Sequence, residues 1–211
     1  MKMLELNGIK IRPVVVVVPE KVERTNFILK ELATRGIHPD VFNGFSSDLS
    51  GLVTKHTYEL DNPGGGHLIG AKCVSTWISF YAMWSALNML DDQFFLTMEW
   101  DAKFDKDWIP KTIDALKHAP KDFDMLLLGS CCTSKKPMTH IGGNVWNVRW
   151  PLCGHATIIA KKCIPKLLAT QRKVYAPLDI SLVLHTFEQA SLGVYTILPR
   201  IVDQFDTFLP T

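Results

Sequence analysis

The sequence predicts an α/β protein: a single domain over residues 1–211, with a mostly parallel central sheet flanked by helices. The chain opens with five consecutive valines at 14–18, followed by apolar residues at helical spacing and a second extended segment at 37–42. A strand, a helix and a strand in this order imply parallel strands joined by a right-handed crossover. A second run, Phe-Phe-Leu-Thr-Met at 94–98, is typical of a strand buried on both faces of such a sheet.

Periodicity and turn residues place the other elements. Asn7-Gly8 predicts a small hairpin near the N-terminus. Apolar residues at helical spacing predict helices at 22–32, 73–90, 108–117, 161–170 and from 179 onward. Short apolar runs predict strands at 125–128, 153–160 and 194–198. Segments 46–68 and 130–151 are expected to be loops, the second either a lid over a site or an ordinary connection.

Size and composition agree with one soluble domain. The 211 residues are 47% hydrophobic and 21% charged, which is enough to bury one core. We expect no secretory leader and no transmembrane segment, because no apolar run approaches the roughly 20 residues that span a bilayer. The five cysteines show no C-x-x-C spacing, which favours a reduced, cytoplasmic protein without a zinc site or a disulfide framework.

Two carboxylates follow the strand at 94–98. Glu99 and Asp101 stand at positions i and i+2, so both project the same way from an extended backbone. Ligands of open α/β sheets bind outside the carboxyl ends of the strands. The pair could therefore hold one hard cation, Mn or Mg, that bridges a diphosphate. The simpler interpretation is that these acids only end the strand and cap the next turn.

The charge is small but unevenly distributed. The net charge is +2, yet no acidic residue lies between Asp124 and Asp179, a stretch that holds eight lysines and arginines. A stretch of one sign favours an anionic partner, which could be a nucleotide diphosphate, an acidic glycan or a nucleic acid. A solvated basic face is the alternative.

Five short motifs occur in an order that resembles a known family. They are an opening strand with an arginine-bearing helix at 14–24, Gly-Ala-Lys-Cys-Val-Ser-Thr at 70–76, Met-Glu-Trp-Asp-Ala at 98–102, Gly-His-Ala-Thr-Ile-Ile-Ala at 154–160 and Pro-Leu-Asp at 177–179. Together they resemble the lipopolysaccharide-type glycosyltransferases, glycosyltransferase family 25, over residues 14–204. The resemblance implies the Rossmann-like GT-A fold and a nucleotide-sugar donor.

The chain departs from the family pattern at three places. Trp100 stands where the family has the middle acid of Glu-Asp-Asp, and Thr76 stands where it has a histidine. Val-Val-Pro at 17–19 replaces the usual Asn-Leu-Asp after the first strand. These differences bear on the choice of donor and on the metal shell.

The resemblance implies a metal-dependent, inverting transfer of a hexosyl or pentosyl group to an acceptor hydroxyl of a glycan or lipooligosaccharide. Inversion needs a carboxylate that takes the acceptor proton, and Asp179 is the candidate, although its position also suits a helix N-cap. Glu99 and Asp101 are the expected metal ligands. His155 and His185 are candidates to complete the shell, unless they are structural.

Further side chains are candidates for binding the two substrates. The candidate donor-binding residues are Val18, Arg24, Ser75, Trp100 and Asp101. Arg24 lies one turn into a helix, from which it could reach a phosphate or base, or remain exposed. The basic stretch with its interleaved aromatic residues supplies the candidate acceptor- and phosphate-binding residues Lys135, Lys136, Trp146 and Arg149.

Two alternatives remain open at the sequence level. The basic second half would suit a glycosyltransferase that modifies DNA at a hydroxymethylated pyrimidine flipped out of the helix. The replacements at Trp100 and Thr76 would suit a non-catalytic protein that binds a nucleotide sugar or a glycan. A dinucleotide-dependent oxidoreductase is disfavoured, because no G-x-G-x-x-G follows the valine strand.

Overall fold

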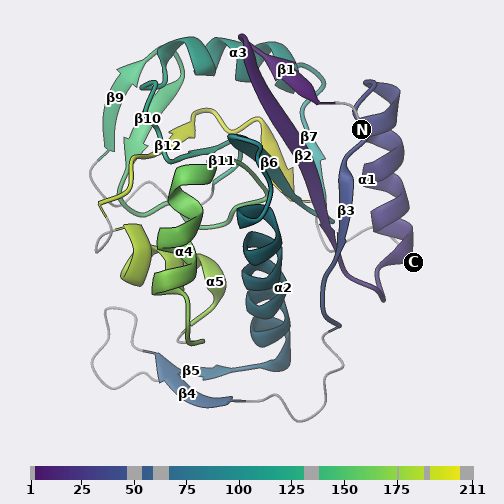
Figure 1. Cartoon of the computed structure of the whole chain (residues 1–211), viewed down its shortest axis with the longest axis vertical. Helices are drawn as coiled ribbons and strands as arrows, with labels where there is room; N and C mark the ends of the chain where they lie inside the picture. The colour runs from purple at the N-terminus through teal and green to yellow at the C-terminus, as the bar shows by residue number, and fades with distance from the viewer. Residues whose placement is uncertain are drawn as a thin grey trace.

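A nine-stranded sheet organises the computed structural model, which describes residues 3–46, 54–58, 67–130, 138–174, 176–187 and 191–204. The strand order is β1-β2-β6-β11-β8-β12-β10-β9, and β3 pairs with β2 beside β1. The strands are β1 Leu4–Leu6, β2 Ile9–Val17, β3 Asp40–Asn43, β6 Phe94–Glu99, β8 Met125–Leu127, β9 Met138–Gly142, β10 Val145–Val148, β11 Ala156–Ala160 and β12 Val194–Ile197. Figure 1 shows this sheet with helices on both sides.

The sheet is mixed. Among the described strands, β2 runs parallel to β3 and β6, and β8 runs parallel to β12. Strand β11 is antiparallel to both of its neighbours, β6 and β8. This arrangement places the residues before β11 next to the carboxyl end of β6. The predicted α/β class, a central sheet flanked by helices, is confirmed, but the sheet is mixed, with three parallel and five antiparallel pairings among its described strands.

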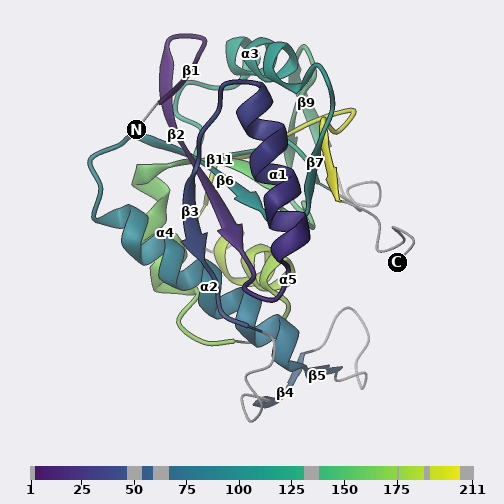
Figure 2. The ribbon, with the colours of Figure 1, turned by 90° about the vertical axis from the view of Figure 1, so that its right-hand side faces the viewer.

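Helices cover the two faces of the sheet. Helices α1 (Val22–Thr34) and α3 (Trp108–His118) pack on one face, and α2 (Ala71–Asn88), α4 (Ile164–Thr170) and α5 (Leu178–Leu182) pack on the other. Both faces of the sheet are apolar because successive side chains of β2 point to opposite faces. Val15 and Val17 belong to the core under α1 and α3, and Val14 and Val16 belong to the core under α2, α4 and α5. Figure 2 shows α1 and α2 beside β2 and β3, on different sides.

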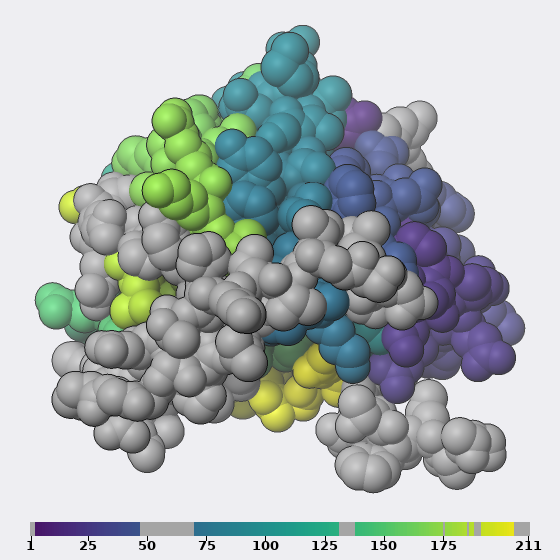
Figure 3. Space-filling model, turned by 90° about the horizontal axis from the view of Figure 1, so that it is seen from below, coloured from purple at the N-terminus to yellow at the C-terminus, as the bar shows by residue number. Residues whose placement is uncertain are grey.

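The remaining elements are short. A 3-10 turn, Lys161–Cys163, precedes α4, and a π-helical turn, Val183–Phe187, continues α5. Two small ribbons pair β4 (Thr54–Tyr58) with β5 (His67–Ile69) and β7 (Ala102–Phe104) with β13 (Val202–Gln204). In Figure 3, which views the molecule from below, α2 in blue-green lies between the green α4 segment and the purple N-terminal segment.

Several predicted elements need correction. The segment 130–151 is not simply a loop, because β9 and β10 form a hairpin there whose turn residue Gly143 has a φ of +53°. Within 46–68, strand β4 and part of β5 replace the expected irregular chain. The strand expected at 153–160 begins only at Ala156.

The cysteines also differ from expectation. Cys73 and Cys163 are free thiols, as predicted, but Cys153 is disulfide-bonded. The sequence gave no sign of this bond, because the number of cysteines is odd and disulfide connectivity cannot be deduced from sequence alone. No helix in the described part of the chain is both long and apolar enough to cross a bilayer.

Candidate functional site

Glu99 and His155 face each other across two antiparallel strands. Glu99 ends β6, and its backbone N–H donates to the carbonyl of His155, 2.9 Å away, directly before β11. Opposed residues of antiparallel strands carry their side chains on the same face. The Nδ1 atom of His155 accordingly lies 3.6 Å from Oε2 of Glu99, which makes the pair an ion pair when the imidazole is protonated.

Asp101 is only 4% exposed and lies in the turn that follows β6, so it does not continue an extended backbone from Glu99 as the i and i+2 spacing predicted. Its Oδ2 accepts a hydrogen bond of 2.7 Å from Nε2 of Gln204, a residue that the pairing of β13 with β7 brings alongside. Its Oδ1 is buried and has no partner in the described part of the structure. A buried carboxylate oxygen without a donor is costly unless something else binds it.

The charges of these residues are coupled. Burial raises the pKa of Asp101, the hydrogen bond from Gln204 opposes that shift, and the negative charge of Glu99 adds to it. For His155, burial alone would lower the pKa, but Glu99, Asp101 and Asp203 raise it above the ordinary value overall. Negative charge therefore accumulates around this cluster, and a positive charge is favoured there.

The Glu99–Asp101–His155 cluster has donor atoms that suit a divalent cation. Carboxylate oxygens suit Mn and Mg, and imidazole nitrogen is tolerated by the first of these. Within the described part of the chain, Oδ1 of Asp101 and Nδ1 of His155 are buried without a hydrogen-bond partner, so a cation would satisfy both atoms. Among the described residues, no group of three His, Cys, Asp or Glu side chains is arranged so that it could hold a metal ion. The donor types suit a divalent cation, but the three side chains do not form a closed site.

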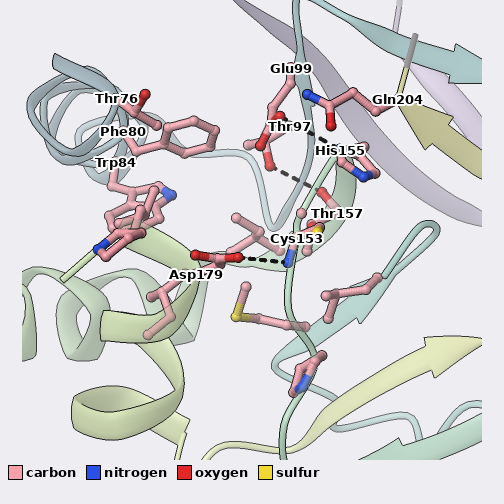
Figure 4. Close-up of a pocket in the computed structure, with 18 of the residues that line it drawn as sticks. Thr76, Phe80, Trp84, Thr97, Glu99, Cys153, His155, Thr157, Asp179 and Gln204 are labelled. Carbon is pink, nitrogen blue, oxygen red and sulfur yellow. Dashed lines mark hydrogen bonds and ion pairs between the residues drawn. The ribbon is translucent and has the colours of Figure 1, made fainter. Parts of the chain in front are cut away.

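A cavity of about 300 Å³ lies beside the cluster on the α2 face of the sheet. Its floor is formed by alternate residues of three adjacent strands. They are Thr97 and Glu99 of β6, Met125 and Leu127 of β8, Thr157 and Ile159 of β11, and His155 directly before β11. One wall is α2 and the opposite wall is α5 with the turn that follows it. Figure 4 shows Phe80 and Trp84 on the first wall and Asp179 across from Glu99. We call this the larger cavity.

Asp179 lines the larger cavity from the first turn of α5. Its Oδ2 accepts a hydrogen bond from the backbone N–H of Cys153 at 3.1 Å, and its Oδ1 accepts one from the N–H of Ile180 at 2.9 Å. Cys153 has a positive φ of 62°, which is uncommon for a residue other than glycine. Two backbone donors thus fix the carboxylate, and each oxygen keeps a lone pair for another donor.

A smaller cavity of about 190 Å³ adjoins the larger one, and both are lined by Thr76, Phe80, Glu99 and Gln204. Four of the predicted donor-binding residues line the smaller cavity: Val18, Ser75, Trp100 and Asp101. Arg24, the fifth, places its guanidinium 5.3 Å from the ring centre of Trp100, within cation–π distance. The structure therefore brings all five together on one side of the cluster.

The residues predicted to bind the acceptor lie elsewhere. Trp146 is in β10, where its ring packs 4.7 Å from that of His140, and Arg149 is exposed after the same strand. Neither lines the larger or the smaller cavity. Lys135 and Lys136 lie outside the described residues, as does the side chain of His185. Of the two histidine candidates, His155 is the one placed at the cluster.

Sequence reasoning missed several residues of the site. Gln204 and Asp203 belong to a three-residue strand, and Asp101 and Gln204 are 103 positions apart, so no local pattern connects them. Phe80 and Trp84 were expected to be core residues, and they are buried, but they also line the larger cavity. The helical spacing of these two aromatic residues from Thr76 was the available signal.

Comparisons with known proteins give similar folds at low identity. Neither a protein-family model nor a curated protein matches the sequence. A solved glycosyltransferase involved in glycosylation of the major capsid of PBCV-1 is 6% identical over 88% of this chain and 81% of its own, with a TM-score of 0.47.

Two further solved structures are similar at the same level. A Drosophila galactosyltransferase 7 mutant, in complex with manganese, UDP-Gal and xylobiose, is 10% identical over 92% of this chain and 71% of its own, with a TM-score of 0.43. The inositol-1-phosphate CTP transferase of T. maritima is 12% identical over 87% of this chain and 64% of its own, with a TM-score of 0.42. At these values the function has to be argued from the residues of the site, and the resemblance to family 25 stays a prediction.

Proposed function

We propose that the protein is a metal-dependent glycosyltransferase that moves a sugar from a nucleotide-diphosphate donor to an acceptor hydroxyl, with inversion. The observation that carries the proposal is the Glu99–Asp101–His155 cluster at the junction of two cavities, with Asp179 across the larger one. Ligands for a diphosphate-bound cation and a separate proton acceptor are the two kinds of group that this reaction needs.

The donor would occupy the smaller cavity and extend to the cluster. Val18 and Trp100 offer apolar and aromatic surface for the nucleoside, and Ser75 lies beside them. The guanidinium of Arg24, stacked over Trp100, would contribute positive charge on the phosphate side. In this placement the sugar reaches Glu99, one of the four residues that line both cavities.

The metal ligands proposed are Asp101, Glu99 and His155. Mn or Mg, when bound, offsets the negative charge that develops on the departing diphosphate. Asp101 would bind through Oδ1, because Gln204 already occupies Oδ2. His155 would bind through Nδ1, whose position beside Glu99 is set by the pairing of β11 with β6.

Asp179 is proposed as the group that accepts the proton of the attacking hydroxyl. It lies on the wall opposite the cluster, so an acceptor between them would approach the sugar from the side away from the diphosphate. The backbone donors from Cys153 and Ile180 keep the carboxylate oriented without consuming its second lone pairs. We do not extend the proposal to DNA, because Trp146 and Arg149 do not line either cavity.

The test is nucleotide release from a panel of nucleotide sugars with Mn or Mg. We expect metal-dependent release from one donor in the wild type, and loss of at least a hundredfold in rate in Asp101→Ala. Asp107→Ala is the matched control, since Asp107 is an exposed carboxylate outside both cavities. The proposal fails if no donor is bound in calorimetry, or if both variants release nucleotide at the wild-type rate.

A further inference from the structure

The larger cavity has both polar and apolar lining. Of the lining residues, Lys72 and Thr76 are exposed, and Glu99 and Asp179 are half-buried, as are the apolar Pro177 and Leu178. Most of the buried ones are apolar: Phe80, Trp84, Met125, Leu127, Ile159 and Phe187. Leu182, half-buried on α5, belongs with this apolar group. The cavity therefore has a polar end at the reacting groups and an apolar inner part.

The cavity is open to solvent at its polar end and extends into the fold as an apolar recess. Protein interiors are otherwise close-packed, with few voids larger than a water molecule. Here about 300 Å³ is kept next to the residues proposed for catalysis, between α2 and α5. Such a space is expected to hold a ligand group rather than to remain empty.

The size and lining indicate which group fits. A cavity of about 150 Å³ lined by aliphatic and aromatic side chains admits one benzene-sized ring. The inner part offers aromatic faces from Phe80, Trp84 and Phe187, while the buried polar lining residues, Thr97, His155 and Thr157, lie on the strand floor. An uncharged ring is therefore favoured there over a second sugar, whose hydroxyls would need partners.

We propose that the acceptor carries a single apolar ring, aromatic or alicyclic, close to the hydroxyl that is glycosylated. This inference rests on the proposed function and specifies its acceptor. With the ring in the inner part, the hydroxyl lies at the polar end near Asp179. Its oxygen forms the bond to the anomeric carbon and its proton passes to Asp179. The bond from the anomeric carbon to the phosphate oxygen breaks, and the electron pair leaves with the nucleotide diphosphate.

The test compares phenyl and methyl glycosides of the same sugars as acceptors with the active donor. We expect kcat/KM for the phenyl member of at least one pair to exceed that of the methyl member more than tenfold, and Leu182→Trp, which fills the inner part, to remove this preference. Leu168→Trp is the matched control, because Leu168 packs on the same core from α4 without lining the cavity. Donor turnover without any phenyl preference overturns the inference and leaves the proposed function standing.

A binding measurement decides the case in which no donor is consumed. Calorimetry or ligand-observed NMR with phenyl glycosides alone reports on the cavity without catalysis. Binding to the wild type that weakens at least tenfold in Leu182→Trp, and not in Leu168→Trp, supports the apolar subsite even if the glycosyltransferase assignment fails. Absence of phenyl binding to folded wild-type protein overturns the inference.

Discussion

Asp101 combines a paired and an unpaired oxygen in one buried carboxylate, and Gln204 determines which is which. A side chain that orients a metal ligand usually changes metal affinity by 10–100-fold when it is removed. Gln204 lines both cavities from β13, which pairs with β7. We therefore assign Gln204 the role of positioning Asp101.

Gln204→Met should weaken Mn binding about 10–100-fold, because Asp101 loses the donor that holds Oδ2. Titration of Mn followed by electron paramagnetic resonance measures this directly. Gln93→Met is the control, since Gln93 is an exposed amide remote from both cavities. Equal Mn affinity in both variants would show that Gln204 does not position Asp101. Partial recovery of Mn affinity in Gln204→Asn would support the positioning role.

Asp179→Asn should separate chemistry from binding. The amide keeps the size of the side chain but cannot take a proton, so transfer to an acceptor should fall about 10²–10⁴-fold. Donor and metal binding should remain within a few-fold of the wild type, because Asp179 lines the larger cavity only. Steady-state transfer kinetics and calorimetry test the two parts. A variant with full transfer activity would leave Asp179 as a structural residue of the first turn of α5.

Cys73 gives a chemical probe of the larger cavity. Burial, together with the nearby charge of Asp179, raises the pKa of its thiol above the ordinary value of 9.0. The thiol is then mostly protonated at pH 8, so its alkylation by iodoacetamide should be slow there and still rising above pH 9. Cys163, buried with a pKa of about 12, is the internal control and should stay unlabelled in folded protein.

Mass spectrometry of the two cysteine peptides over a pH series provides the measurement. A bound acceptor should slow the labelling of Cys73 without changing its pH dependence. A rate that levels off below pH 8 would mean that the thiol is neither buried nor near a negative charge as the structure places it.

At the level of elements, the sequence predicted what is local and strongly patterned. Strand β6 at Phe94–Glu99 and helix α3 at Trp108–His118 agree with prediction to within a residue or so, because each has an apolar pattern that spans the whole element. Hairpin β9–β10 was missed. Thr139, His140 and Ile141 are exposed at the edge of the sheet, so β9 lacks the alternation that signals a strand.

The ribbon of β7 and β13 depends on a close approach at Gly129. A Cβ on Gly129 would lie 2.0 Å from the carbonyl oxygen of Val202, while the N–H groups of Ile201 and Val202 donate to the carbonyl of Leu128. Only glycine lets the chain that leaves β8 pass so near to β13. The position of Gln204, two residues after Val202, follows from that contact.

Gly129→Ala should destabilise the protein by about 1–3 kcal/mol, the usual cost of forcing extra volume into a packed site, and should weaken Mn binding as β13 shifts. Urea denaturation gives the free energy of unfolding. Gly70→Ala is the matched control, because a Cβ there meets nothing within 4 Å. If the two variants have the same stability, the contact with Val202 is not a constraint.

For the whole molecule, the site draws on both halves of the chain. The carboxyl-end rule for parallel sheets was enough to predict that Glu99 and Asp101 lie at the end of β6, where the structure has Glu99 lining both cavities and Asp101 lining the smaller one. The contact between His155 and Glu99 could be identified only from the fold. His155 directly precedes β11, and it reaches Glu99 because β11 runs antiparallel to β6. Which histidine and which second-half residues meet the cluster is a long-range property that composition and periodicity do not encode.

The Glu99–Asp101–His155 cluster, as a site for a metal-bound diphosphate, is central to the proposed function. The most direct measurement is calorimetric titration of the wild type and of Asp101→Asn with nucleoside diphosphates, with and without Mn. We predict binding of one nucleoside diphosphate to the wild type that requires Mn, and a loss of at least tenfold in affinity in the variant. Binding that is equally strong without Mn, or unchanged in Asp101→Asn, would contradict the account.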